Sequence, residues 1–226
     1  MTSVTQRLRH AGTSKGLRHA LWLVQFEWTL NLIHRRSVKK LRNSIKGKSD
    51  LRLHLGCGSN PKPDWINIDL FAPSSDAQLD LREDWPFTAN AASRVYSEHV
   101  FEHFEYPVEV RHFLAETLRV LKPGGTIDIG VPDTEWPLTA YGDSSNEYWK
   151  VAKAVWHPSY CETHLDHINY HFRQGQEHKY AWDAVTLTNE LQKAGFVSIE
   201  RRVFDPSLDL ESRRLGTLYM RARKPT

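Results

Sequence analysis

The feature that most constrains the fold is a glycine turn between two short apolar segments. The stretch Leu53-His-Leu-Gly-Cys-Gly-Ser-Asn-Pro61 runs from a strand-like sequence into Gly56-Cys57-Gly58, and Ile66-Asn-Ile-Asp-Leu70 follows. Glycine has no Cβ, so a Gly-x-Gly turn lets the backbone approach a ligand closely. An acid at the tip of the next parallel strand, here Asp69, can accept hydrogen bonds from ribose hydroxyls. The two features together predict a nucleoside site at the carboxyl ends of a parallel sheet.

The remainder of the chain alternates strand-like and helix-like patterns, which predicts an α/β fold with a mostly parallel, seven-stranded sheet. Helices are expected over about 107–121 and about 184–194, the second capped by Asp183 and closed by Gly195. The first strands are separated by about ten residues or fewer, whereas a crossover helix needs about ten to twelve or more. Short front-half connections are therefore expected. The expected strands are 51–55, 65–69, 77–80, 93–97, 125–130, 196–202 and 215–221.

The spacing around the turn narrows the choice of nucleoside. A dinucleotide fingerprint has a third glycine and an acid about 20 residues further on, but here Pro61 holds the third position and Asp69 follows after eleven residues. A phosphate-binding loop would need Gly-Lys-Ser/Thr after the turn, and none follows it. The turn is therefore expected to serve a ligand without phosphate, such as S-adenosylmethionine.

Composition places the chain among soluble globular proteins, with 40% hydrophobic and 25% charged residues. One of the two cysteines, Cys57, lies inside the glycine turn, so a structural disulfide with Cys161 is not expected. A reduced, cytoplasmic compartment follows as the expectation.

Charge is unevenly divided along the chain. Residues 1–49 carry eleven Lys/Arg and one acid, a net of +10, which leaves −7 on the remainder of a chain whose net charge is +3. An acidic body argues against a nucleic-acid-binding core. Residues 20–33 form an apolar stretch of 14 residues, too short for a bilayer, which takes about 20, and without a signal-peptide cleavage pattern. Residues 15–46 thus resemble a basic amphipathic helix that contacts an anionic membrane surface (the inner face), a second subunit of a homo-oligomer, or the domain itself.

Several ordered motifs resemble those of class I S-adenosylmethionine-dependent methyltransferases, in particular a compact subgroup associated with polysaccharide biosynthesis. The resemblance covers about residues 51–222 and implies a Rossmann-like fold. It divides the chain into an arm, 1–49, and a methyltransferase domain, 50–226, with an acceptor lid at about 134–182 after the fifth strand. The motifs that carry it are LHLGCGSNPKPDWINIDL, LDLREDWPF, VYSEHVFEH, LAETLRVLKPGGTIDIGVPD and LQKAGFVSIERR.

The resemblance implies a set of cofactor-binding residues. The glycine turn would cradle the methionine part, Asp69 would hold the ribose, and Asp80 and Leu81 would flank the adenine. The segment after the fourth strand would line the methyl end, although Glu98, Glu102 and His103 also suit the start of a helix. The implied residues are Leu55, Gly56, Cys57, Gly58, Asp69, Asp80, Leu81, Ser97, Glu98 and His99.

The acceptor side is expected in the lid, which is rich in aromatic residues and histidines. In a helix over 163–173, His164, His167 and His171 would share one face. O-methylation needs a base near neutral pH, a role that suits histidine, so His167, then His164, with Asp166 beside them, are the catalytic candidates; partly buried lid histidines are the alternative.

No metal set is assigned from the sequence. Magnesium could orient vicinal hydroxyls through the oxygen ligands Asp133, Glu135, Glu162 or Asp166, and a zinc site from the three histidines fits by spacing alone. The expected function is transfer of a methyl group from S-adenosylmethionine to a hydroxyl of a saccharide or glycan precursor. The alternatives are O-methylation of a lipid or another small molecule, and a non-catalytic protein that binds S-adenosylmethionine.

Overall fold

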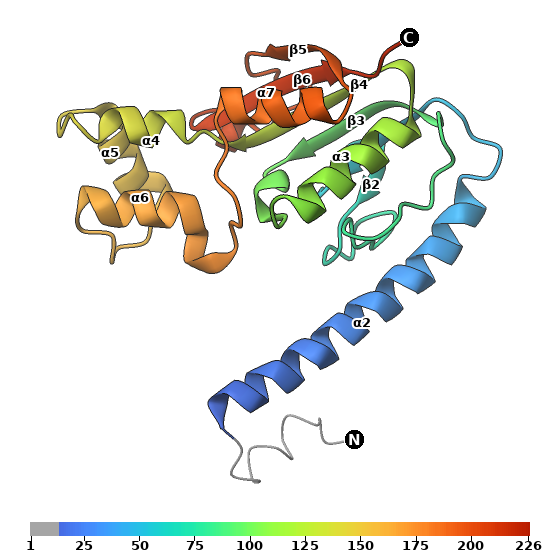
Figure 1. Ribbon diagram of the computed structural model, residues 1–226, viewed down its shortest axis with the longest axis horizontal. Helices are drawn as coiled ribbons and strands as arrows, with labels where there is room; N and C mark the ends of the chain where they lie inside the picture. The colour runs from blue at the N-terminus through green and yellow to red at the C-terminus, as the bar shows by residue number, and fades with distance from the viewer. Residues whose placement is uncertain (1–13) are drawn as a thin grey trace.

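The computed structural model describes residues 14–226, and the first 13 residues of the expected arm lie outside this range. The elements are arranged as one α/β body from which helix α2 projects (Figure 1). The strands are β1 (Leu51–Leu55), β2 (Ile66–Ile68), β3 (Ala92–Glu98), β4 (Leu121–Pro132), β5 (Val197–Arg201) and β6 (Thr217–Arg223). The main helices are α2 (Lys15–Ser44), α3 (Val108–Val120), α4 (Glu135–Ala140), α5 (Glu147–Val151), α6 (His164–Arg173) and α7 (Ala184–Lys193). Short helical turns are η1 (Phe101–His103), η2 (Ala152–Trp156), η3 (Gln174–Gln176) and η4 (Glu211–Arg213).

The strands form one six-stranded sheet in the order β2-β1-β3-β4-β6-β5. The pairs from β2 to β4 are parallel, and β6 runs antiparallel to both β4 and β5. The Rossmann-like arrangement is as expected, but the expected sheet of seven strands is not found in the described residues. Residues 77–80 contribute only an isolated bridge between Ile68 and Ala77, because Asp76 turns inward to bind the backbone of Asn67.

The two faces of the sheet are covered differently. On one face, apolar side chains such as Leu53, Val95 and Ile127 are buried in the main core, beneath α3 and α7. On the other face, Asp128 is fully buried and forms ion pairs with Arg94, Arg202 and Arg221. Since the short front-half connections supply no helix to this face, charged pairs cover it in place of apolar packing.

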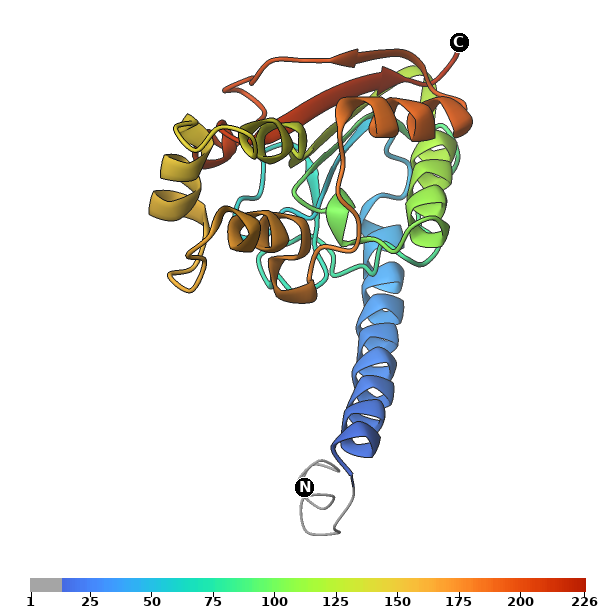
Figure 2. The ribbon, with the colours of Figure 1, turned by 60° about the vertical axis from the view of Figure 1, so that its left-hand side comes forward.

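Between β4 and α7 the chain folds into a helical insertion (residues 134–182) beyond the carboxyl ends of the strands (Figure 2). Its two ends lie side by side, since Asp133 bridges Trp182 and Thr134 N–H donates to the Trp182 carbonyl. A small core of its own surrounds Tyr148 and Trp149. The insertion is thus a unit with a small core of its own, and its two ends meet where it joins the body.

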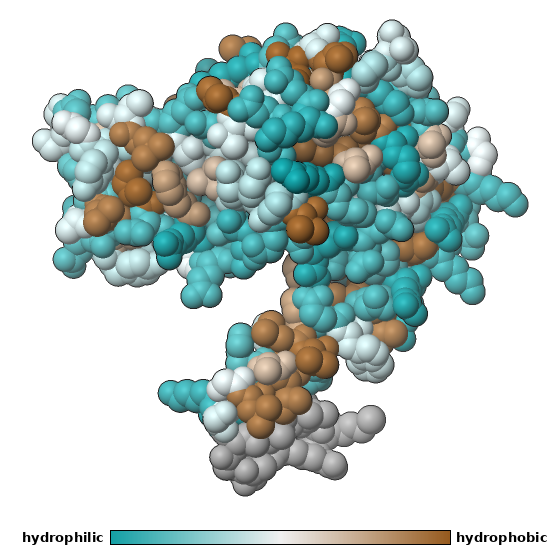
Figure 3. Space-filling view, in the orientation of Figure 1, coloured by the Kyte–Doolittle hydropathy of each residue, from teal (hydrophilic) through white to brown (hydrophobic). Residues whose placement is uncertain are grey.

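Helix α2 has two dissimilar halves. Leu30, His34 and Leu41 are buried against the body, whereas Trp22 and Trp28 are 45% and 66% exposed. The exposed apolar side chains gather on the projecting half (Figure 3). None of the helices within residues 14–226 has both the length and the apolar content needed to cross a membrane.

Candidate active site

A donor pocket, a cavity of about 150 Å³, opens where the sequence placed the nucleoside site. Its wall consists of the glycine turn, residues 56–60, together with His54, Lys62, Glu98 and Arg213. The turn follows β1, and Glu98 ends the adjacent parallel strand β3. The pocket therefore lies at the carboxyl edge of the sheet, the usual ligand position in open α/β folds.

The glycine turn has the shape of a cradle. A Cβ on Gly56, whose φ is +70°, would lie 1.9 Å from Val100 Cγ2, so no side chain fits there. A Cβ on Gly58 would meet nothing within 4 Å, which leaves the backbone open to a ligand. The Asp69 carboxylate fixes the turn by accepting hydrogen bonds from the N–H of Gly58 at 2.9 Å and of Phe71 and Ala72 at 2.8 Å. A carboxylate has about four acceptor positions, so one remains for a hydroxyl.

Charges in the donor pocket match a zwitterionic amino-acid group. Glu98 lies 3.7 Å from Arg213, and burial raises the pKa of its carboxyl. Lys62 stands 4.7 Å above the Tyr96 ring, and burial lowers the pKa of its ammonium. The cations suit a ligand carboxylate and Glu98 suits a ligand ammonium, whereas burial raises the pKa of the Cys57 thiol to about 11 and makes it unreactive.

Asp80 lies beside the expected adenine position, but its carboxylate is already paired. Both oxygens accept hydrogen bonds from Arg82, which also pairs with Glu27 of α2 at 2.9 Å. Burial works to raise the pKa of Asp80, but the bonds from Arg82 outweigh it and lower the pKa. The Asp80 N–H donates to His34 Nδ1 of α2, so the arm's inner half is anchored to the body at Asp80, which does not line the donor pocket.

The other implied cofactor residues are placed more deeply. Leu55 and Leu81 belong to the main core and do not line the donor pocket. Ser97 is fully buried, and its Oγ finds no hydrogen-bond partner within residues 14–226.

An acceptor pocket of about 360 Å³ adjoins the first and shares Arg213 with it. The helical insertion supplies Trp156, His157, Tyr170, His171 and His178 to its wall. The body supplies His99, the residue directly after Glu98 of the donor pocket. The two pockets thus meet at the end of β3.

His99 stands at this junction in a constrained conformation. Its φ is +55°, in the left-handed region that few non-glycine residues adopt. The Thr217 hydroxyl donates to the Arg213 carbonyl, so its oxygen accepts from His99 Nε2 at 2.9 Å. The ring proton therefore sits on Nε2, and Nδ1 faces Glu102 at 3.6 Å. Burial holds the pKa of His99 well below its usual value, so the ring is neutral.

The catalytic candidates from the sequence line neither pocket directly. His164 stacks on Trp149 at 3.9 Å between ring centroids, and Asp166 caps α6 in a capping box with Thr163. His167 is buried, and its Nδ1 lies 2.8 Å from Nδ1 of His157, which does line the acceptor pocket. Burial, and secondarily His167, lowers the pKa of His157 to about 4.

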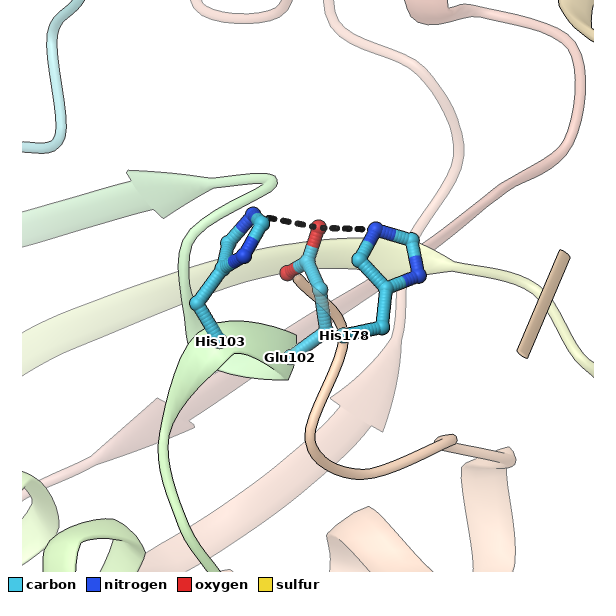
Figure 4. Close-up of side chains that lie close together, drawn as sticks. All are labelled: Glu102, His103 and His178. Atoms are coloured by element: carbon cyan, nitrogen blue, oxygen red, sulfur yellow. Dashed lines mark ion pairs between the residues drawn. The ribbon is translucent and has the colours of Figure 1, made fainter. Parts of the chain in front are cut away.

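A second titratable cluster includes His178 of the acceptor pocket together with Glu102 and His103 (Figure 4). Glu102, from η1, is buried, and burial raises its pKa to about 8. Residues 14–226 contain one group of acids, histidines or cysteines close enough to hold a metal, namely Glu102, His103 and His178. The expected magnesium ligands are not gathered, because Arg201 pairs with Asp133 and Glu135, and magnesium has no support.

Several residues of the two pockets carry no recognisable signal in the sequence. Arg213 comes from η4, between β5 and β6, and nothing in Glu211-Ser-Arg213 is a recognisable motif. His178 comes from the turn after η3, far from η1 in sequence. Lys62 lies in the loop after the glycine turn and lines the donor pocket. Its closeness to that turn in the sequence is a signal that could have indicated it.

The chain was compared with protein families, curated proteins and solved structures. Residues 68–129 match the family described as methyltransferase domain, and no curated protein matches the chain. Similar solved structures include a S-adenosylmethionine-dependent methyltransferase from Thermotoga maritima (14% identity, TM-score 0.48, 89% of this chain and 96% of that one). Another, from Mesorhizobium loti, shows 16% identity and a TM-score of 0.46 over 78% of this chain and 91% of that one. A chain of the Haloferax volcanii complex that contains the Trm112 methyltransferase activator shows 17% identity and a TM-score of 0.48 over 88% and 94%.

Proposed function

We propose that this chain, a methyltransferase that uses S-adenosylmethionine, transfers the methyl group to a hydroxyl of a saccharide or glycan precursor. The observation that carries the proposal is the contact between the donor and acceptor pockets at Glu98, His99 and Arg213. When bound, S-adenosylmethionine supplies a methyl group activated by a sulfonium. The open backbone over Gly58 and the Asp69 carboxylate fit its methionine and ribose parts.

The wall of the acceptor pocket supports a sugar hydroxyl as acceptor. Trp156 and Tyr170 offer aromatic faces, and Gln174, Ser212 and the imidazoles offer hydrogen bonds. A sugar ring presents apolar C–H faces and polar edges, and such mixed walls suit it. A lipid or phenol acceptor would use the same aromatic faces with fewer of the polar groups.

We assign the role of general base to His157, with His167 as its positioning partner. His157 is neutral near pH 7, since its pKa is lowered to about 4 by burial, and a neutral ring can take the hydroxyl proton. The two Nδ1 atoms lie 2.8 Å apart and share one proton in a hydrogen bond. This hydrogen bond lets His167 fix the orientation of the His157 ring. General-base catalysis typically contributes roughly 10²- to 10⁴-fold.

Calorimetry with S-adenosylhomocysteine tests the cofactor site. Asp69→Ala should weaken binding by roughly 10- to 100-fold, because hydrogen bonds to charged groups contribute about 1.5–3 kcal/mol. Asp64→Ala, at an exposed carboxylate that pairs with Arg52, is the matched control and should bind normally. Unchanged affinity of Asp69→Ala for S-adenosylhomocysteine would contradict the cofactor assignment.

A radiolabelled methyl-transfer screen over sugars, lipids and phenols tests the acceptor class. Transfer to sugars that His157→Gln abolishes, while calorimetry shows normal cofactor binding, is the expected result. Transfer to lipids or phenols alone would replace the saccharide assignment. Tight cofactor binding without transfer to any acceptor would favour a non-catalytic binding protein.

A further inference from the structure

A carboxylate and two imidazoles from distant segments face one another beside the acceptor pocket (Figure 4). Glu102 and His103 belong to η1, and His178 lies between η3 and α7. Oε1 of Glu102 lies 3.9 Å from Nε2 of His103 and 3.9 Å from Nε2 of His178. All three ligand atoms lie within 4.8 Å of one another.

Backbone carbonyls fix the tautomer of both imidazoles. Nδ1 of His103 lies 3.0 Å from the Glu177 carbonyl, and Nδ1 of His178 lies 3.0 Å from the His171 carbonyl. A carbonyl oxygen only accepts, so each Nδ1 carries the ring proton and each Nε2 presents a lone pair to Glu102. Histidines that bind metals are held in the same way, with the second ring nitrogen donating to a carbonyl or carboxylate.

The Glu102 carboxylate is buried without compensation. Its side chain is 1% exposed, and in the described part of the chain neither oxygen finds a hydrogen-bond partner. A buried charge without a partner is costly. These three groups therefore direct electron pairs toward one point, and Nδ1 of His99 faces the same carboxyl at 3.6 Å, so a cation there would stabilise all of them.

We propose that Glu102, His103 and His178 bind one divalent transition-metal ion, with zinc as the best match. Two nitrogen ligands and one carboxylate suit zinc, whereas magnesium prefers oxygen ligands throughout. Ligand atoms around tetrahedral zinc lie about 3.3 Å apart, so binding requires the two 3.9 Å distances to close by about 0.6 Å and the two Nε2 atoms to approach by up to about 1.5 Å. The His103 side chain is 38% exposed and gives the ion a route from solvent.

The ion would join the insertion to the end of β3. The same segments already meet through their backbones, because the N–H groups of Lys179 and Tyr180 donate to the Glu102 carbonyl. His178 also lines the acceptor pocket, so the ion would lie at the edge of that pocket. The metal site stands on this geometry alone and does not depend on methyl transfer.

Metal titration of the chelator-treated full-length protein tests the site. Calorimetry with Zn²⁺ should show one equivalent bound, and Co²⁺ should give visible ligand-field bands of a tetrahedral site. Glu102→Gln and His178→Ala should weaken binding by roughly 100-fold or more, since each removes one of three ligands. X-ray absorption of the zinc form should show two imidazoles and an oxygen ligand.

Two matched controls locate the ion. Glu109→Gln replaces a carboxylate on α3, and His164→Ala removes the imidazole stacked on Trp149, so both should bind zinc normally. Circular dichroism confirms that each variant is folded. Wild-type protein that takes up no stoichiometric zinc or cobalt overturns the proposal, and so does loss of binding in His164→Ala with retention in Glu102→Gln.

Discussion

At the residue scale, an uncharged histidine supports a loop that lines the donor pocket. His54 is 5% exposed, and its Nδ1 lies 3.1 Å from the Asn67 amide oxygen. Asn67 in turn binds the backbone of Lys62, so the pair supports the loop that carries the pocket's lysine. Burial lowers the pKa of His54 to about 4, and protonating it in the folded protein is therefore unfavourable.

This lowered pKa predicts an acid-sensitive contribution to stability. Because the unfolded chain protonates His54 near pH 6.5 and the folded chain only near 4, the unfolded state binds more protons between these values. The contribution of the neutral His54 ring to folding stability is complete above pH 6.5 and is lost as the pH falls toward 4. Between pH 7.5 and 5, the wild-type protein should lose about 2 kcal/mol more unfolding free energy than the His54→Gln variant loses.

Urea unfolding at the two pH values measures this difference. His157 and His171, with pKa values lowered by burial to about 4 and about 3, make the wild-type loss steeper, so the comparison is between variants. His19→Gln, at an exposed position on α2, serves as control and should leave the loss unchanged. An identical loss in His54→Gln and wild type would contradict the account.

Local patterns explain which site residues the sequence could predict. Gly56, Gly58 and Asp69 were expected at the pocket because a turn and a strand-end acid are signals confined to a few neighbouring residues. Arg213 and His178 reach the site from loops whose position depends on the whole fold. Asp80 matched its motif, but its pairing with Arg82 and Glu27 required knowledge of where α2 packs.

At the element scale, one of the contacts between the helical insertion and the body is unusually close. Gly216 has φ +77°, and a Cβ there would lie 2.6 Å from Cη2 of Trp156. Trp156 lines the acceptor pocket. The glycine therefore allows the insertion to pack directly on the chain before β6.

Gly216→Ala should disturb the acceptor pocket and spare the donor pocket. The strained φ and the displaced ring should lower the unfolding free energy by about 1–3 kcal/mol and raise KM for the acceptor. Affinity for S-adenosylhomocysteine should stay within twofold, because Gly216 is not part of the donor pocket. Gly142→Ala, where a Cβ meets nothing within 4 Å, is the control, and equal effects of both variants would refute the role of the contact.

Elements with regular patterns followed the sequence more closely than those without. Helices α3 and α7 and the strands around them lie near their expected positions, since periodicity and caps such as Asp183 are local. The 77–80 segment is apolar enough for a strand, yet the Asp76 side chain takes the backbone partner that a ladder would use. The helices of the insertion pack around Tyr148 and Trp149, a core that periodicity alone did not reveal.

At the scale of the whole molecule, the basic arm and the acidic body give the chain two differently charged ends. The outer half of α2 projects from the body with Trp22 and Trp28 exposed (Figure 3), while residues 1–49 carry a net charge of +10. Its inner half is joined to the body at Asp80 and Arg82. Apolar side chains flanked by cations are the combination that binds anionic lipid surfaces.

The full-length protein should therefore bind vesicles that contain anionic phosphatidylglycerol and should not bind neutral phosphatidylcholine vesicles. Trp22→Ser with Trp28→Ser should lower partitioning by roughly tenfold or more, because each indole contributes buried apolar area, and added salt should weaken it further. Co-sedimentation measures both effects. Deletion of the whole arm would be a poorer test, since Leu41 belongs to the main core.

Leu138→Ser with Tyr141→Ser is the matched control, because these side chains are 55% and 53% exposed on the helical insertion, away from the arm. This variant should bind vesicles as the wild type does. If wild-type protein never co-sediments, and the tryptophan variant instead changes a dimer to a monomer in light scattering, the arm contacts a second subunit. The arm would then present the apolar surface of Trp22 and Trp28 to protein rather than lipid, while its inner half stays packed on the body through Leu41 and His34.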